Sequence, residues 1–175
     1  MFWIACETGG LPELIPLEDN PLWAFPALLD GTVSALSSLP LGNIIAFNVY
    51  IEHPSPDFTV DPTEIITKLA TVFEKCPRLY EVVLTKFPPR CLPVFSGERM
   101  PLIQVLVINH SEDYPWEELV EHVTEVARAR HSRGLPLKQI EIITAVEERP
   151  RIEELERLVQ EVKYLVEPLR EDSYA

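Results

Sequence analysis

Four short segments of the chain alternate apolar and polar residues or run almost continuously apolar, and both patterns predict β-strands. They are rich in Ile, Val, Leu and Phe, the aliphatic and aromatic residues that strands favour. The third is aliphatic on both faces, as expected of a central strand in a parallel sheet. The four segments are residues 43–52, 79–85, 102–109 and 137–144.

Between and after these strands, apolar residues recur at helical spacing in three places. Two of the predicted helices cover residues 61–76 and 113–133. The third begins near Pro150 and ends before Pro168, which cannot continue a helix. The return after the second strand, residues 87–93, is too rich in proline for an α-helix and predicts a loop or a 3₁₀ turn.

The strands begin with a recurring skeleton of leucine, two variable residues, an aliphatic residue, one variable residue and, in three of four copies, another aliphatic residue. The anchors are Leu41, Leu79, Leu102 and Leu137, which lie 38, 23 and 35 residues apart. Each strand–helix unit has an apolar face that only a neighbouring unit can bury. We therefore predict an α/β fold in residues 41–175: a leucine-rich-repeat-like strand–helix stack with a short parallel sheet.

Residues 1–40 are apolar enough to pack, but Pro12, Pro16, Pro21 and Pro26 prevent any long helix. We predict that they form an irregular N-terminal cap over the first repeat, within a single globular unit. The alternative is that they are the remnant of a longer, truncated segment.

The stretch Cys76-Pro77-Arg78-Leu79-Tyr80-Glu81-Val82-Val83-Leu84 resembles the repeats of F-box/leucine-rich-repeat proteins, in which a helix ends in Cys-Pro before a leucine-rich strand. The resemblance covers about residues 41–145. It implies a substrate receptor of a cullin-based ubiquitin ligase, whose repeats hold the target while an N-terminal F-box holds a Skp-type adaptor. Leu11-Pro12-Glu13-Leu14-Ile15 is similar to the start of an F-box, but prolines break the helical continuation. We therefore expect a Skp-type adaptor only if a cryptic F-box exists.

In such a stack the side chains between the anchors line the concave strand face. The stripe predicted here is unusually apolar, and contiguous apolar surface usually means contact with a partner. The alternative is that a loop, residues 1–40 or another chain covers it. The predicted partner-binding residues are Ile45, Phe47, Val83, Thr85, Leu106, Ile108, Glu141 and Ile143.

No catalytic motif is recognisable, so we expect a non-catalytic protein–protein interaction module without a cofactor or a bound metal. One alternative stays open, a small α/β metal-dependent or hydrolytic enzyme. It would use His53 with Asp57 and His110 with Asp113, because parallel sheets place ligands beyond the C-terminal ends of their strands.

Charge and cysteine content narrow the partners and the compartment. The formal net charge of −13 disfavours nucleic acid and anionic membranes, so neither is an expected partner. Cys6, Cys76 and Cys91 match no zinc or redox spacing, which favours reduced thiols in the cytoplasm or the nucleus. No segment approaches the roughly 18 apolar residues of a membrane helix.

Overall fold

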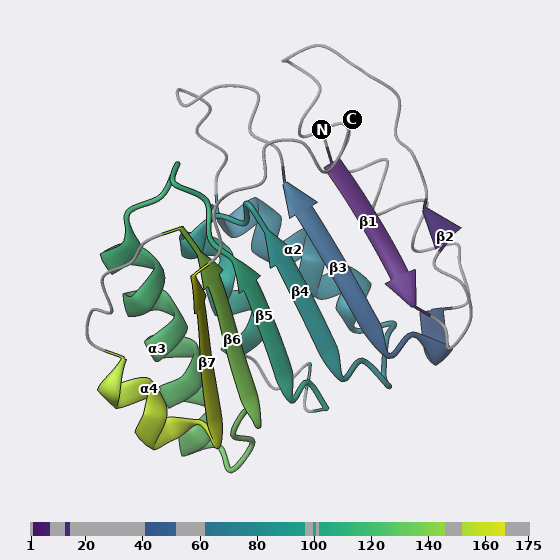
Figure 1. Cartoon of the computed structure of the whole chain (residues 1–175). Helices are drawn as coiled ribbons and strands as arrows, with labels where there is room; N and C mark the ends of the chain where they lie inside the picture. The colour runs from purple at the N-terminus through teal and green to yellow at the C-terminus, as the bar shows by residue number, and fades with distance from the viewer. Residues whose placement is uncertain are drawn as a thin grey trace.

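The computed structural model describes residues 2–7, 13–14, 41–51, 62–96, 100, 102–145 and 152–166. These residues form one sheet with helices between its strands (Figure 1). The predicted α/β class with a short parallel sheet is confirmed.

The sheet of the described residues has the strand order β2-β1-β3-β4-β5-β6-β7. From β3 to β7 the strands are parallel, and each pairs with the next one along the chain. At the other edge, β1 is antiparallel to β3 and β2 is antiparallel to β1. The strands are β1 (Phe2–Glu7), β2 (Glu13–Leu14), β3 (Ala46–Ile51), β4 (Glu81–Thr85), β5 (Val105–Asn109), β6 (Gln139–Thr144) and β7 (Glu161–Val166).

Each parallel strand returns to the next through a helical segment. Figure 1 shows α2 behind β3 and β4, and the buried residues of helices and strands join in one hydrophobic core. The predicted 3₁₀ return after the second strand is confirmed as η2. The helical segments are η1 (Leu41–Asn43), α2 (Pro62–Phe73), η2 (Pro89–Ser96), α3 (Trp116–Ser132) and α4 (Glu153–Leu158).

The parallel strands share one inward-facing skeleton, an apolar anchor followed at the third and fifth positions by two more apolar residues. The anchors of successive strands lie 35, 24, 34 and 22 residues apart. The longer intervals contain α2 and α3, and the shorter ones contain η2 and α4. All members are buried except the last two, which are partly buried and pack against the core. The sets are Ile44-Phe47-Val49, Leu79-Val82-Leu84, Ile103-Leu106-Ile108, Leu137-Ile140-Ile142 and Val159-Val162-Tyr164.

A repeated backbone junction fixes how neighbouring strands line up. The carbonyl of Ile45, one residue after its anchor, accepts hydrogen bonds from the N–H groups of Tyr80 and Glu81, at 2.8 and 3.1 Å. The residue after each later anchor repeats this arrangement. The Tyr80 carbonyl accepts from the N–H groups of Gln104 and Val105, and the Gln104 carbonyl accepts from those of Lys138 and Gln139. The Lys138 carbonyl accepts from the N–H of Glu161.

The prediction of one long helix after Pro150 is wrong. The chain forms the short helix α4, becomes extended at Val159 and then adds β7 to the sheet. Apolar residues at 162, 164 and 166 fit alternation as well as helical spacing. The edge of β6 decides between them, because its backbone groups gain hydrogen-bond partners only if the next segment is a strand.

The structure also describes two strands in the segment predicted to be an irregular cap. β1 and β2 extend the sheet from β3 with antiparallel pairing, which the sequence analysis did not anticipate. The rest of residues 1–40 lies outside the described residues, so the cap stays a prediction.

Arg130 fastens the end of α3 to the segment that enters β5. Its guanidinium Nη1 donates to the carbonyls of Phe95 and Met100, both at 3.1 Å, and its Nη2 donates to the carbonyl of Ile103 at 2.7 Å. The residue is only 1% exposed, and burial lowers the pKa of its guanidinium. The basic last turn of α3 therefore includes one cation that is buried and bound to backbone carbonyls.

Candidate functional site

The candidate site is the face of the parallel sheet opposite the core, which we call the open face. Its side chains alternate with the buried ones and are mostly half-buried. The pairing register arranges them in three rows that run across β3 to β7. The rows are Ala46-Glu81-Val105-Gln139-Glu161, Asn48-Val83-Val107-Glu141-Lys163 and Tyr50-Thr85-Asn109-Ile143-Leu165.

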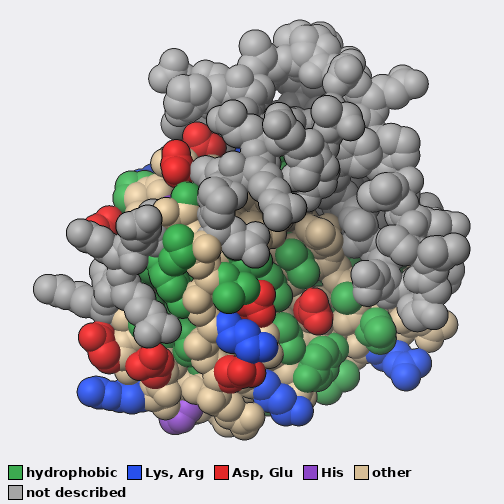
Figure 2. Space-filling model, in the orientation of Figure 1, with side chains coloured by type: hydrophobic (Ala, Val, Ile, Leu, Met, Phe, Trp, Pro, Cys, Tyr) green, Lys and Arg blue, Asp and Glu red, His purple; other side chains and the backbone are tan. Residues whose placement is uncertain are grey.

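This open face has an apolar middle and a charged side. Val83, Val105 and Val107 occupy adjacent positions on β4 and β5. Toward β7 the middle row continues with Glu141 and Lys163, which lie opposite each other on β6 and β7. Figure 2 shows hydrophobic side chains over the sheet, with acidic and basic side chains among them toward the N-terminal ends of the strands.

Side-chain hydrogen bonds order part of this face. Asn109 Nδ2 donates to Thr85 Oγ1 at 2.9 Å, which ties β5 to β4. On β6, Gln139 Nε2 donates to Glu141 Oε2 at 3.1 Å. These bonds hold polar groups in fixed directions beside the valines, so the face offers both apolar contact and oriented hydrogen-bonding groups.

Two lysine–tyrosine pairs stand near the ends of the strands. Lys86 Nζ lies 5.8 Å from the centre of the Tyr50 ring, and Lys138 Nζ lies 5.9 Å from that of Tyr80. Both distances suit a cation–π contact. Lys86 has a φ of 52°, a left-handed conformation that turns the chain directly after β4.

The structure places four of the predicted partner-binding residues on the open face. Val83 and Thr85 belong to β4, and Glu141 and Ile143 belong to β6; all are half-buried. Ile45 lies just before β3, where its side chain is exposed. That these residues bind a partner stays a prediction.

The predicted exposure of Phe47, Leu106 and Ile108 is wrong, because all three are buried in the core. The error comes from the choice of anchor. The leucine pattern predicts Leu102 as the anchor of the third strand, but its side chain is 49% exposed, whereas that of Ile103 is 1% exposed. A shift of one residue exchanges the two faces of a strand.

The same reasoning from the sequence missed Val105 and Val107, which take the places assigned to Leu106 and Ile108. Alignment of Ile103-Leu106-Ile108 with Leu79-Val82-Leu84 would have found them. In the first strand, Ile44-Phe47-Val49 is the matching set, so Asn48 and Tyr50 face outward in place of Phe47.

His110, from the alternative enzyme hypothesis, is buried at the C-terminal end of β5. Its Nε2 is 2.9 Å from the carbonyl oxygen of Tyr114, which can only accept, so Nε2 carries a hydrogen. Its Nδ1 is 2.9 Å from Thr144 Oγ1, and its ring meets that of Trp116 edge-on at 5.5 Å. Burial lowers the pKa of His110, which favours the neutral imidazole. Both of its ring nitrogens are engaged in hydrogen bonds within the fold.

Of the other three residues of that hypothesis, only Asp113 belongs to the part of the chain that the structure describes. Asp113 accepts a hydrogen bond from Ser111 Oγ at 2.7 Å, and His53 and Asp57 lie outside the described residues. Within the part of the chain that the structure describes, no three His, Cys, Asp or Glu side chains are placed to hold a metal ion. The enzyme hypothesis therefore stays untested.

Comparison with known proteins does not assign the chain to a family. None of the known protein-family models matches the chain, and neither the curated proteins nor the solved structures contain a match. Among the described residues, no helix has both the length and the apolar character needed to span a membrane.

Proposed function

We propose that this chain is a non-catalytic protein-interaction module of the leucine-rich-repeat type, which binds a protein partner across the open face of its parallel sheet. The observation that carries the proposal is the division of five sequential parallel strands into a packed face and a face with regular rows of half-buried side chains. Solenoid repeats use such extended surfaces for binding.

The buried skeleton supports the repeat type. Its pattern matches the first part of the leucine-rich repeat. Each copy has an apolar residue, two variable residues, an apolar residue, one variable residue and a third apolar residue. The match is partial, because the later position where that pattern has Asn or Cys holds Phe87, Ser111 and Ala145 in three of the repeats. Phe87 and Ser111 are both buried there.

The mixed character of the open face supports a protein as the partner. Protein interfaces combine an apolar centre with a polar rim. Here Val83, Val105 and Val107 supply the centre, while Glu141 and Lys163 supply charges of both signs at its side. By resemblance, the partner would be the target of a cullin-based ubiquitin ligase, and a Skp-type adaptor would bind only if residues 1–40 contain an F-box.

The test is affinity capture from a cell lysate with the full chain and two variants as bait. The first variant, Val83→Lys with Ile143→Lys, adds two positive charges to the open face. In the control, Leu102→Lys with Val166→Lys, the same charge is added at exposed apolar residues outside the three rows. Circular dichroism establishes that both variants fold.

We expect the open-face variant to lose its captured proteins at least tenfold by quantitative mass spectrometry, because a buried cation at an interface is costly. The control should keep them. Retention by the open-face variant would exclude this face as the binding surface. Recovery of a Skp-type adaptor together with a cullin would support the ligase link separately.

A further inference from the structure

The strand β7 ends the sheet that the structure describes, and β6 is the neighbour with which it pairs. On the side away from β6 it meets no further strand within the described residues; we call this side its outer edge. An edge strand offers backbone N–H and C=O groups to another chain. Two apolar side chains of β7 are also exposed, Leu165 by 40% and Val166 by 48%. The outer edge of β7 is therefore a candidate contact surface.

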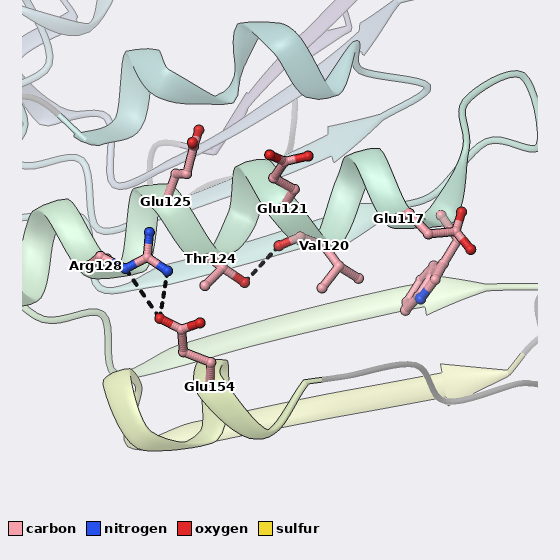
Figure 3. A pocket seen from close by; sticks show the side chains of 8 residues that line it. Glu117, Val120, Glu121, Thr124, Glu125, Arg128 and Glu154 are labelled. Atoms are coloured by element: carbon pink, nitrogen blue, oxygen red, sulfur yellow. Dashed lines mark hydrogen bonds and ion pairs between the residues drawn. The ribbon is translucent and has the colours of Figure 1, made fainter.

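The core and the helix α4 hold β7 in place. Val162 and Tyr164 pack against the core, and Leu155 of α4 is fully buried in it. Arg128 Nε and Nη2 of α3 donate to Glu154 Oε1 of α4 at 3.1 and 2.6 Å, and Figure 3 shows this pair at one end of a pocket along α3. Because the strand is already formed, pairing at its outer edge requires little further ordering of the chain.

The backbone N–H and C=O of Val162 point to the outer edge. Glu161 donates its N–H to the carbonyl of Lys138 at 2.9 Å, so its backbone groups face β6. Along a strand these groups point to one side and then to the other from one residue to the next. The backbone groups of Val162 therefore point away from β6, and those of Lys163 face β6 again.

A second copy of the same strand can approach this edge in only a few registers. A two-fold axis perpendicular to the sheet sets two copies of β7 antiparallel and leaves both open faces on the same side. Such an axis passes between one residue and the same residue of the second copy. The chain is extended at Val159 and along Glu161–Val166. Axes at Val162 or at Lys163 therefore pair the largest part of it.

Only the axis at Val162 brings opposite charges together. Glu161 then lies opposite Lys163 of the second copy, and the same pair repeats on the other side of the axis. These two residues exchange no backbone hydrogen bonds, and in such pairs the side chains come closest. The register also sets Leu165 opposite Val159 of the second copy, apolar against apolar. An axis at Lys163 would instead set the two lysines against each other.

We propose that two copies of this chain pair through the outer edges of β7, antiparallel and with the two-fold axis at Val162. Each Val162 N–H donates to the carbonyl of the other Val162, and Glu161 and Lys163 form two symmetric ion pairs across the strands. The net charge of −13 on each copy opposes association at long range, but about 0.15 M salt screens charges more than about 8 Å apart. The pairing does not depend on what the open face binds.

The first experiment measures the dissociation constant of the dimer by sedimentation velocity at about 0.15 M salt. The edge variants are Lys163→Glu, which sets acidic residues against each other across the axis, and Glu161→Lys, which does the same with lysines. The matched controls are Arg78→Glu and Glu121→Lys, which make the same changes of charge at exposed positions outside β7. Circular dichroism establishes that each variant folds.

We expect a reversible dimer of the unmodified chain, and a dissociation constant at least about tenfold higher in each edge variant, because two attractions become two repulsions. Each control should change it by less than about twofold. A chain that is still monomeric at about 1 mM would overturn the proposal. Equal weakening by edge variants and controls would overturn it too, because the effect would then come from the net charge alone.

A mixture of the two edge variants tests the register. In a pair made of one copy of Lys163→Glu and one of Glu161→Lys, the facing charges are again opposite. We therefore expect the mixture to dimerise although each variant alone does so poorly. The double exchange, Glu161→Lys with Lys163→Glu, should dimerise like the unmodified chain. If neither the mixture nor the double exchange restores the dimer, these charges do not face each other across the axis and the proposal fails.

A second readout locates the contact without relying on affinity. Amide hydrogen exchange is followed by NMR in the unmodified chain and in Lys163→Glu at the same concentration. We expect the Val162 amide to exchange at least about tenfold more slowly in the unmodified chain, because it donates across the axis only in the dimer. The Leu165 amide faces β6 in both chains and should differ little. A dimer that leaves the Val162 amide unprotected would show that the copies associate through another surface.

Discussion

At the scale of single residues, two buried polar side chains hold ends of elements in place. Arg130 gathers three carbonyls from the segment between η2 and β5, and His110 bridges the start of α3 to the end of β6. Neither role is readable from the sequence. A basic residue near a helix end predicts a solvated side chain, and only the tertiary fold brings carbonyls from 27 to 35 residues away.

Replacing Arg130 with methionine should lower the free energy of unfolding by at least about 2 kcal/mol, because the carbonyls of Phe95, Met100 and Ile103 lose their charged donors in a buried place. Urea denaturation followed by circular dichroism measures the change. The control Arg157→Met, at an exposed position of α4, should stay within about 0.5 kcal/mol. A similar small effect at both positions would mean that Arg130 contributes little.

Stability should fall as the pH falls, in part through His110. Burial is the main cause of its lowered pKa; the hydrogen bond to the Tyr114 carbonyl and the charge of Glu112 oppose it. The unfolded chain therefore takes up a proton near pH 6.5, before the folded chain does, so stability is lost as pH drops below that value. Urea titrations between about pH 7.5 and 5.5 should show a smaller loss in His110→Gln than in the unmodified chain. An identical slope in both chains would refute the assignment.

At the scale of elements, the sequence predicted most of the parallel strands and both long helices, but it misassigned the buried face of two strands, β3 and β5, and misread one helix. Four strands and the helices α2 and α3 stand where the apolar periodicity placed them. Register depends on which leucine or isoleucine begins the count, and Leu102-Ile103 offers two candidates. The α4–β7 segment fits both periods, so the free edge of β6 decided its structure.

The corrected register makes a direct prediction for the third strand. Leu106→Ala should destabilise the protein by about 2–5 kcal/mol, because Leu106 is fully buried in the core. Leu102→Ala, at the neighbouring exposed leucine, should cost less than about 1 kcal/mol. Thermal and urea unfolding of the two variants, measured side by side, distinguish this register from the one with Leu102 as the anchor. In that register Leu102→Ala would be the more destabilising substitution.

At the scale of the whole molecule, the candidate site could be predicted only in part. Alternation along β4 and β6 correctly indicated Val83, Thr85, Glu141 and Ile143 as residues of one face. The rows themselves depend on the pairing between strands, which no single segment encodes.

The shared carbonyl junctions also determine which changes of chain length this architecture tolerates. Each junction ties the residue after one anchor to the first residues of the next strand, whatever lies between them. The return segments can therefore be lengthened or shortened, as the intervals of 35, 24, 34 and 22 residues already illustrate. An insertion of one residue between an anchor and its strand would instead turn core side chains outward. For protein engineering, grafts and insertions belong in the helical returns, and the short stretch from anchor to strand must keep its length.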